Sequence, residues 1–420
     1  MNGKWRFGIL AAVTPLLCAG AIDARAQAPA GAPAPSWHFS QDGLVQVIGN
    51  HQGGPRGGDE VVVPNWWMGV LSRAHGRQQF GLTTMFSLDA ATVGRDGYRE
   101  LFQVGETLNG APLVDRQHPH DFFMQLAGSW RIPVGERAAL VLAGGPSGEP
   151  TLGPVAFMHR PSAAGLPFAP LGHHTFDSTH VSFGVVTASL GIGRWSFEGS
   201  AFNGREPDEH RWDFDFGALD SFAGRVWFRP APRWEVQVSS GHLTEPEVLE
   251  PGDVQRTTAS ASWFAPASGG LTAVTAGYGV NAAHGQLRQG LFAEGHVERG
   301  PHAWFGRFEV QQVETDVLLT GGAPDPDDHD EAVNPPSTVV ALTLGASRRI
   351  FTWKGFDGAL TGQVVFHATP SALEPAYGPH PVSFQVLFRL RLPAPGGRMW
   401  NMKMSQGHTM ETGHAGHHMQ

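Results

Sequence analysis

The chain has 420 residues, with 55 glycines, 13 tryptophans, 16% charged residues and a formal net charge of −9 at pH 7. The negative balance gives no indication of a nucleic-acid partner. The only cysteine, Cys18, lies within an early apolar stretch, so disulfides and thiolate chemistry are excluded from the rest of the chain.

The first residues predict a secretory signal peptide. Lys4 and Arg6 precede an apolar stretch over 7–22, which ends in small residues that suit cleavage. We expect the signal peptide to span 1–26 and an Ala/Pro-rich linker to span 27–36. Leu17 before Cys18 argues against a lipid anchor.

Residues 37–392 repeat a two-residue alternation. Near the end, "PVSFQVLFRLRLP" places apolar side chains on one face and mostly polar ones on the other. Segments of about ten alternating residues are what a strand needs to cross a bilayer at a tilt. The prediction is an all-β, transmembrane antiparallel β-barrel of about 16 strands, with 14 as an alternative count. A soluble β-sandwich or propeller would also alternate, but tryptophans near the strand ends favour a membrane girdle.

The connections alternate in length. Links such as 74–77, 133–136 and 298–301 are short, whereas others, such as 89–119 and 145–179, are long. Short turns on one rim and long loops on the other are typical of outer-membrane barrels, whose short turns are periplasmic. We therefore expect the outer membrane of a Gram-negative bacterium, with the bilayer as partner. An even strand count returns both termini to the periplasm.

Charged and polar residues are predicted on the inward face of the barrel. Three alternate on one strand, two on the next and two on the last: Glu294, His296, Glu298, Arg307, Glu309, Arg389 and Arg391. Neighbouring strands would pair these charges in a cross-strand ladder that lines a wet pore, and we favour this arrangement over catalysis.

Two long loops are rich in histidine. The candidate metal ligands are His118, His120, His173, His174 and His180. Imidazoles with Asp121 or Asp177 suit Zn, Cu, Ni or Fe. The alternative is a polar plug in which these groups hydrogen-bond one another and Arg116 and Arg160 clamp the aspartates.

An enzyme is the minority hypothesis. Ser178 with His180, or Ser162 with His159, would be the start of a hydrolase triad acting on lipid or envelope material, but no G-x-S-x-G motif is present. The acidic run at 325–331 is interpreted as a solvated loop tip, since it lacks the spacing of an EF-hand loop.

Several loop and strand motifs carry a family resemblance. "DRQHPHDFFMQL", "GPVAFMHRPSA", "GHHTFDSTHVSFGVVT", "SAFNGREPDEHRWDFD" and "DSFAGRVWF" resemble a family of bacterial outer-membrane, porin-like barrel proteins with no assigned activity. The resemblance implies the fold and location and supplies no substrate. Similarity to copper-resistance outer-membrane proteins is compositional only.

Residues 393–420 form a tail rich in methionine and histidine, which we expect to begin in the periplasm. Its candidate copper ligands are Met399, Met402, Met404, His408, Met410, His414, His417, His418 and Met419. Thioethers favour Cu(I), and imidazoles bind both copper states, with Zn or Ni as weaker alternatives. The competing interpretation is a disordered polar extension.

The sequence thus predicts a passive channel or porin-like protein linked to transition-metal handling, with copper first. Metal ions or small polar solutes would be its ligands, and no further cofactor is predicted. A barrel hydrolase and a plugged structural barrel are the alternatives.

Overall fold

The computed structural model describes residues 36–404, apart from 268–269 and 323–333. The predicted signal peptide, nearly all of the linker, the acidic run and the distal tail from 405 onward lie outside the described residues and stay predictions.

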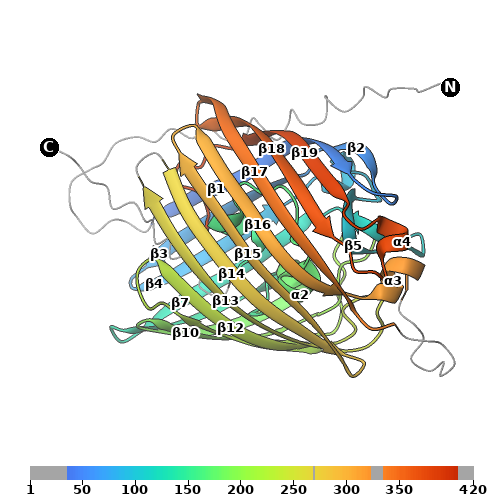
Figure 1. Ribbon diagram of the computed structural model, residues 1–420. Helices are drawn as coiled ribbons and strands as arrows, with labels where there is room; N and C mark the ends of the chain where they lie inside the picture. The colour runs from blue at the N-terminus through green and yellow to red at the C-terminus, as the bar shows by residue number, and fades with distance from the viewer. Residues whose placement is uncertain (1–35, 268–269, 323–333, 405–420) are drawn as a thin grey trace. The chain divides into compact units, whose positions relative to one another are not determined.

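Sixteen antiparallel strands close into a barrel, which confirms the predicted fold and the higher strand count (Figure 1). Each strand pairs with its neighbours in the barrel, and β1 closes the sheet by pairing with both β19 and β3. The barrel strands are β1 (Trp37–Gln52), β3 (Asn65–His75), β4 (Gln78–Phe86), β7 (Phe123–Val134), β8 (Ala138–Gly148), β9 (Ser182–Ile192), β10 (Trp195–Phe202), β11 (Ser221–Phe228), β12 (Trp234–Leu243), β13 (Val254–Ala267), β14 (Gly270–Ala283), β15 (Gln286–Arg299), β16 (His302–Val313), β17 (Ser337–Trp353), β18 (Phe356–Ala368) and β19 (Val382–Arg391).

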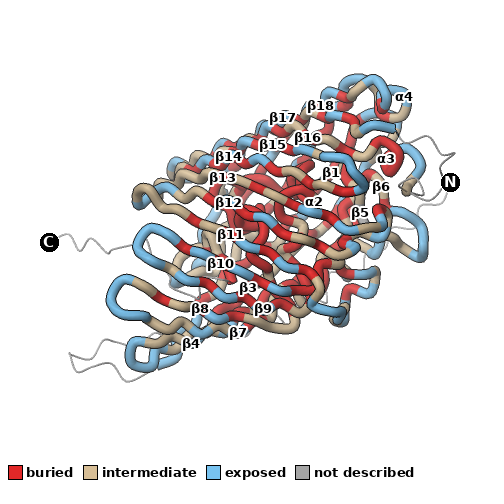
Figure 2. Tube along the Cα trace, turned by 90° about the horizontal axis from the view of Figure 1, so that it is seen from below, coloured by how far each residue is buried: buried red, intermediate tan, exposed pale blue. Residues whose placement is uncertain are grey.

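The alternation in the sequence becomes the two faces of the wall. On β19, Phe384 and Val386 are 50% and 62% exposed on the outside, whereas Ser383 and Gln385 are 0% and 1% exposed toward the lumen. Other strands repeat this pattern, so buried and exposed residues alternate along the wall (Figure 2). An apolar outer band on a closed barrel is the surface that a bilayer requires. The protein is therefore an outer-membrane barrel.

The two rims differ as predicted. Four of the short turns contain a glycine with positive φ, Gly76, Gly135, Gly193 and Gly300, which lets the strands reverse tightly. The start of β1 and the end of β19 lie on this short-turn rim, because Trp37 pairs with Arg73 and Arg391 pairs with Asp357. The tail therefore starts on the periplasmic side.

The long connections carry the remaining elements. These are β2 (Gly58–Val62), which extends the sheet beside β1, the hairpin of β5 (Tyr98–Leu108) and β6 (Ala111–Gln117), the helices α1 (Asp89–Thr92), α2 (His173–Phe176), α3 (Thr315–Thr320) and α4 (Glu374–Tyr377), and the 3-10 turns η1 (Phe157–His159), η2 (Pro161–Ala163) and η3 (Ser178–His180). Among the described residues, no helix has the length and apolar character needed to cross a bilayer.

Candidate functional site in the barrel lumen

The connection between β8 and β9, residues 149–181, folds into the lumen, and we call it the plug. Most of its side chains are buried. Hydrogen bonds tie it to several wall strands: Thr151 to Ser200 on β10 (2.9 Å), the Gly153 N–H to Ser239 on β12 (2.9 Å) and Ser162 to Thr275 on β14 (2.7 Å). The plug is thus held around much of the circumference.

A buried ion network fixes the centre of the plug. Arg160 contacts Glu294 of β15 at 2.7 Å and Asp177 of the plug at 2.8 Å, and Arg307 of β16 contacts the same Glu294 at 3.0 Å. Burial opposes ionisation of Asp177, but the Arg160 guanidinium and the His173 ring outweigh it and hold the pKa of that carboxyl well below its usual range. The Asp177 carboxylate therefore stays charged at neutral pH.

The predicted inward-facing set is found on the inward face, where part of it contacts the plug and part of it lines an open space. Glu294 on β15 is the direct cross-strand partner of Arg307 on β16. Glu309 accepts the Leu171 N–H of the plug at 2.7 Å. Arg389 and Arg391 both donate to the carbonyl of Ala164. At Glu294 and Glu309 the plug, a long-range loop, therefore supplies partners for the wall.

His296 and Glu298, with Arg389 and Arg391, line an open vestibule of about 1390 Å³. The short turns, such as the one at Glu136 and Arg137, surround it, so it opens on the periplasmic side. The vestibule is large enough for small hydrated solutes, and the plug closes its inner end.

The beginning of the tail folds back into this vestibule. Arg398 pairs with Asp42 of β1 at 2.7 Å, and the same carboxylate accepts the Met399 N–H. Lys403, whose side chain is fully buried, pairs with Glu235 of β12 at 3.1 Å, and the Asn401 N–H donates to the His159 carbonyl. The described part of the tail therefore lies in the lumen. The predictions for residues 405–420 stay predictions.

The predicted loop histidines do converge. Ring centroids are 5.6 Å apart for His120 and His180, 5.2 Å for His173 and His180, and 5.5 Å for His173 and His174. Burial, together with the positive charges of Arg211 and neighbouring histidines, lowers the pKa of His118 well below its usual range. Histidines from the two loops therefore lie close together, and metal binding by them stays a prediction.

Most of these rings already have partners. His120 contacts Asp89 at 2.8 Å, His173 contacts Asp177 at 2.8 Å, and the Asp121 carboxylate pairs with Arg211 at 3.2 Å. The polar-plug alternative accounts for these contacts without a metal. Burial, then His173 and His120, lower the pKa of His180 to about 3, so its ring is neutral.

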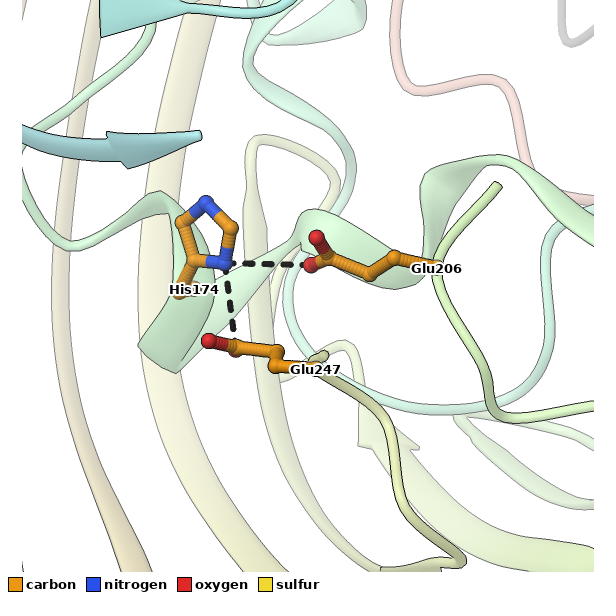
Figure 3. A group of neighbouring side chains, drawn as sticks. All are labelled: His174, Glu206 and Glu247. Carbon is orange, nitrogen blue, oxygen red and sulfur yellow. Dashed lines mark hydrogen bonds and ion pairs between the residues drawn. The ribbon is translucent and has the colours of Figure 1, made fainter. Parts of the chain in front are cut away.

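His174 belongs to a separate group of three possible ligands. Its Nδ1 lies 3.0 Å from Glu206 and 3.1 Å from Glu247, two carboxylates that the sequence did not single out (Figure 3). Within the described part of the chain, this is the only group of three such ligand atoms that includes a histidine; the other is Asp208, Asp213 and Asp215. Burial would lower the pKa of His174, but the two carboxylates raise it well above its usual value. Without a metal, the group is an ion cluster.

The candidate hydrolase serines are engaged elsewhere. Ser162 donates to the Glu294 carboxylate at 2.8 Å and hydrogen-bonds the Thr275 hydroxyl at 2.7 Å, and Ser178 accepts from Arg256 at 3.0 Å. Neither hydroxyl has a hydrogen bond to a histidine among those recorded for the described residues. The geometry therefore offers no support for the triad.

Comparison with solved structures finds the same barrel architecture in other outer-membrane proteins. OprB of Pseudomonas putida, in its high-pH structure, is 11% identical, covers 85% of this chain and 94% of its own, and has a TM-score of 0.53. The chain has a porin fold. A loop L8 deletion mutant of OmpT from Vibrio cholerae (8% identity, 86% and 100% coverage, TM-score 0.49) and OmpF of Salmonella typhi in complex with daunomycin (8%, 84% and 97%, 0.48) are also similar. No protein-family model and no curated protein matches this chain.

Proposed function

We propose that this protein is a porin-like outer-membrane conduit, closed at rest by its plug, that handles transition-metal ions, with copper first. The observation that carries the proposal is the path of the tail. It leaves the last strand on the periplasmic rim and enters the vestibule, where Met399 is only 5% exposed. Met404, which is equally buried, lines a separate small cavity.

The chemistry of the tail supports copper. In an oxidising compartment, a chain whose only cysteine falls within the predicted signal peptide has methionine and histidine as its soft or borderline ligands. The six distal ligands, which lie outside the described residues, are His408, Met410, His414, His417, His418 and Met419. They follow directly on a segment anchored in the vestibule, so captured ions would be held at the entrance to the lumen.

Copper stoichiometry tests the tail. The full-length refolded protein is compared with a full-length variant in which the four distal histidines become Gln and the two distal methionines become Leu. We expect the wild type to bind at least one more copper ion per chain, measured by equilibrium dialysis and elemental analysis. Equal stoichiometry would remove the distal tail from the proposal.

A second candidate is a plugged structural barrel that never conducts. The ion network of Arg160, Asp177, Glu294 and Arg307 favours it, because fully buried charges with good geometry resist displacement. The two candidates differ in whether releasing the plug opens an ion path.

A further inference from the structure

Every methionine in the described part of the chain gathers in one region of the lumen. Met68, Met85, Met124, Met158, Met402 and Met404 line one small cavity, and Met399 packs in the same apolar cluster as five of them. They come from three wall strands, the plug and the tail. Methionine fills irregular gaps in a core and adds a polarisable sulfur atom, so seven methionines in one region concentrate soft ligand atoms there.

The wall contributes three adjacent sulfur side chains. Met68 of β3 and Met85 of β4 are direct cross-strand partners, and Met85 pairs with Gln125, the neighbour of Met124 on β7. All three methionines are at most 3% exposed. The interior of a membrane barrel is normally polar, so three buried thioethers side by side on the inward face depart from that pattern.

The plug adds an imidazole with an unused lone pair. The Nδ1–H of His180 donates to the Asp177 carbonyl at 2.9 Å, which leaves Nε2 as the unprotonated nitrogen. That Nε2 is buried without a hydrogen-bond partner, and His180 lines the same cavity as the methionines. A backbone carbonyl on one ring nitrogen and an open second nitrogen is the arrangement that orients histidine as a metal ligand.

The size of the cavity limits what can bind in it. Its volume of about 20 Å³ is room for a single ion or water and excludes any hydrated solute. Six thioethers make up half of its lining, and Gln125, Glu149, His159, His180 and Lys403 are its polar members. The one ammonium in the lining, on Lys403, is paired with Glu235 at 3.1 Å, so it brings no unbalanced positive charge to the cavity.

We propose that the cavity is a binding site for one soft monovalent metal ion, Cu⁺, held by thioethers of the wall and tail and by Nε2 of His180. This inference rests on the proposed function and deepens it, because it adds a metal site inside the lumen to the ligands of the distal tail. Wall, plug and tail each supply a ligand, so an ion bound here joins the three parts. Soft thioether ligands select Cu⁺ over harder divalent ions.

Silver binding by full-length protein tests the site, with Ag⁺ alone as a redox-stable probe. The triple variant Met68→Leu, Met85→Leu and Met124→Leu keeps nearly the same volume and removes the wall sulfurs. We expect it to bind one Ag⁺ fewer per chain than the wild type, and the distal-tail variant described above to keep that ion. Unchanged binding in the triple variant would overturn the site. Loss of the ion only in the distal-tail variant would also overturn it, while supporting the proposed function.

A second measurement covers the case in which the triple variant fails to fold. The distal-tail variant is loaded with one Cu⁺ and studied by X-ray absorption, where we expect sulfur and imidazole nitrogen in the first shell. The further change His180→Asn keeps a donor for the Asp177 carbonyl and should remove the imidazole signal. A shell of nitrogen and oxygen alone, or an unchanged signal with His180→Asn, would contradict the assignment.

Discussion

Glu294 binds two guanidinium groups at once. Arg160 and Arg307 share its carboxylate, and its side chain is fully buried. In such a site the attraction between charges is strong, but removal of one partner leaves an uncompensated buried charge, which costs about 3 to 5 kcal/mol. Glu294 therefore makes a large contribution to holding the plug.

The change Glu294→Gln should loosen the plug without unfolding the barrel. It removes the negative charge that Arg160 and Arg307 share, so we expect hydrogen exchange over residues 149–181 to become roughly tenfold faster. The matched control is Glu298→Gln on the same face of β15, where the side chain is 35% exposed and its ion pair is long at 3.7 Å. Equal exchange in the two variants would show that the network does not hold the plug.

At the scale of elements, the plug and two outer loops are joined by the ion cluster of His174, Glu206 and Glu247. His174 lies in α2, Glu206 in the loop after β10 and Glu247 in the loop after β12. The charged imidazole is what makes this contact attractive. The connection is therefore sensitive to proton concentration.

This cluster predicts a pH-dependent stability. Because the pKa of His174 is raised on folding above 6.5, its contribution is complete below pH 6.5 and is lost as the pH rises through the higher folded value. The melting temperature of the wild type should exceed that of His174→Gln by a constant margin at low pH and by a shrinking one above it. In a protein carrying Glu206→Gln and Glu247→Gln the margin should disappear. A margin that grows with pH would contradict this.

The elements also show how far sequence reasoning reaches. The strands, the difference between the two rims and the position of both barrel ends on one rim follow from side-chain alternation and loop length, which are local signals. The partners of the plug are not local, since Arg160 and Glu294 are 134 residues apart. The same holds for the methionines: those of the tail stood out by composition, whereas Met68, Met85 and Met124 look like ordinary apolar positions until the barrel closes.

For the whole molecule, three layers lie along the lumen. The periplasmic vestibule is open, the methionine cavity follows, and the plug, which carries His173, His174 and His180, fills the lumen beyond it. A porin-like conduit built this way conducts only when the plug moves. The proposed function therefore requires that an ion path exists and that it is closed at rest.

Ion current through the refolded protein in a planar bilayer tests this most directly, with the wild type compared with Glu294→Gln and with the Glu298→Gln control. We expect little or no current from the wild type and the control, and frequent openings from Glu294→Gln, because only that change releases the plug. A large, steady current from the wild type would show that the lumen is open at rest. Silence in every variant, with hydrogen exchange proving that the plug is loose, would show a structural barrel and contradict the conduit.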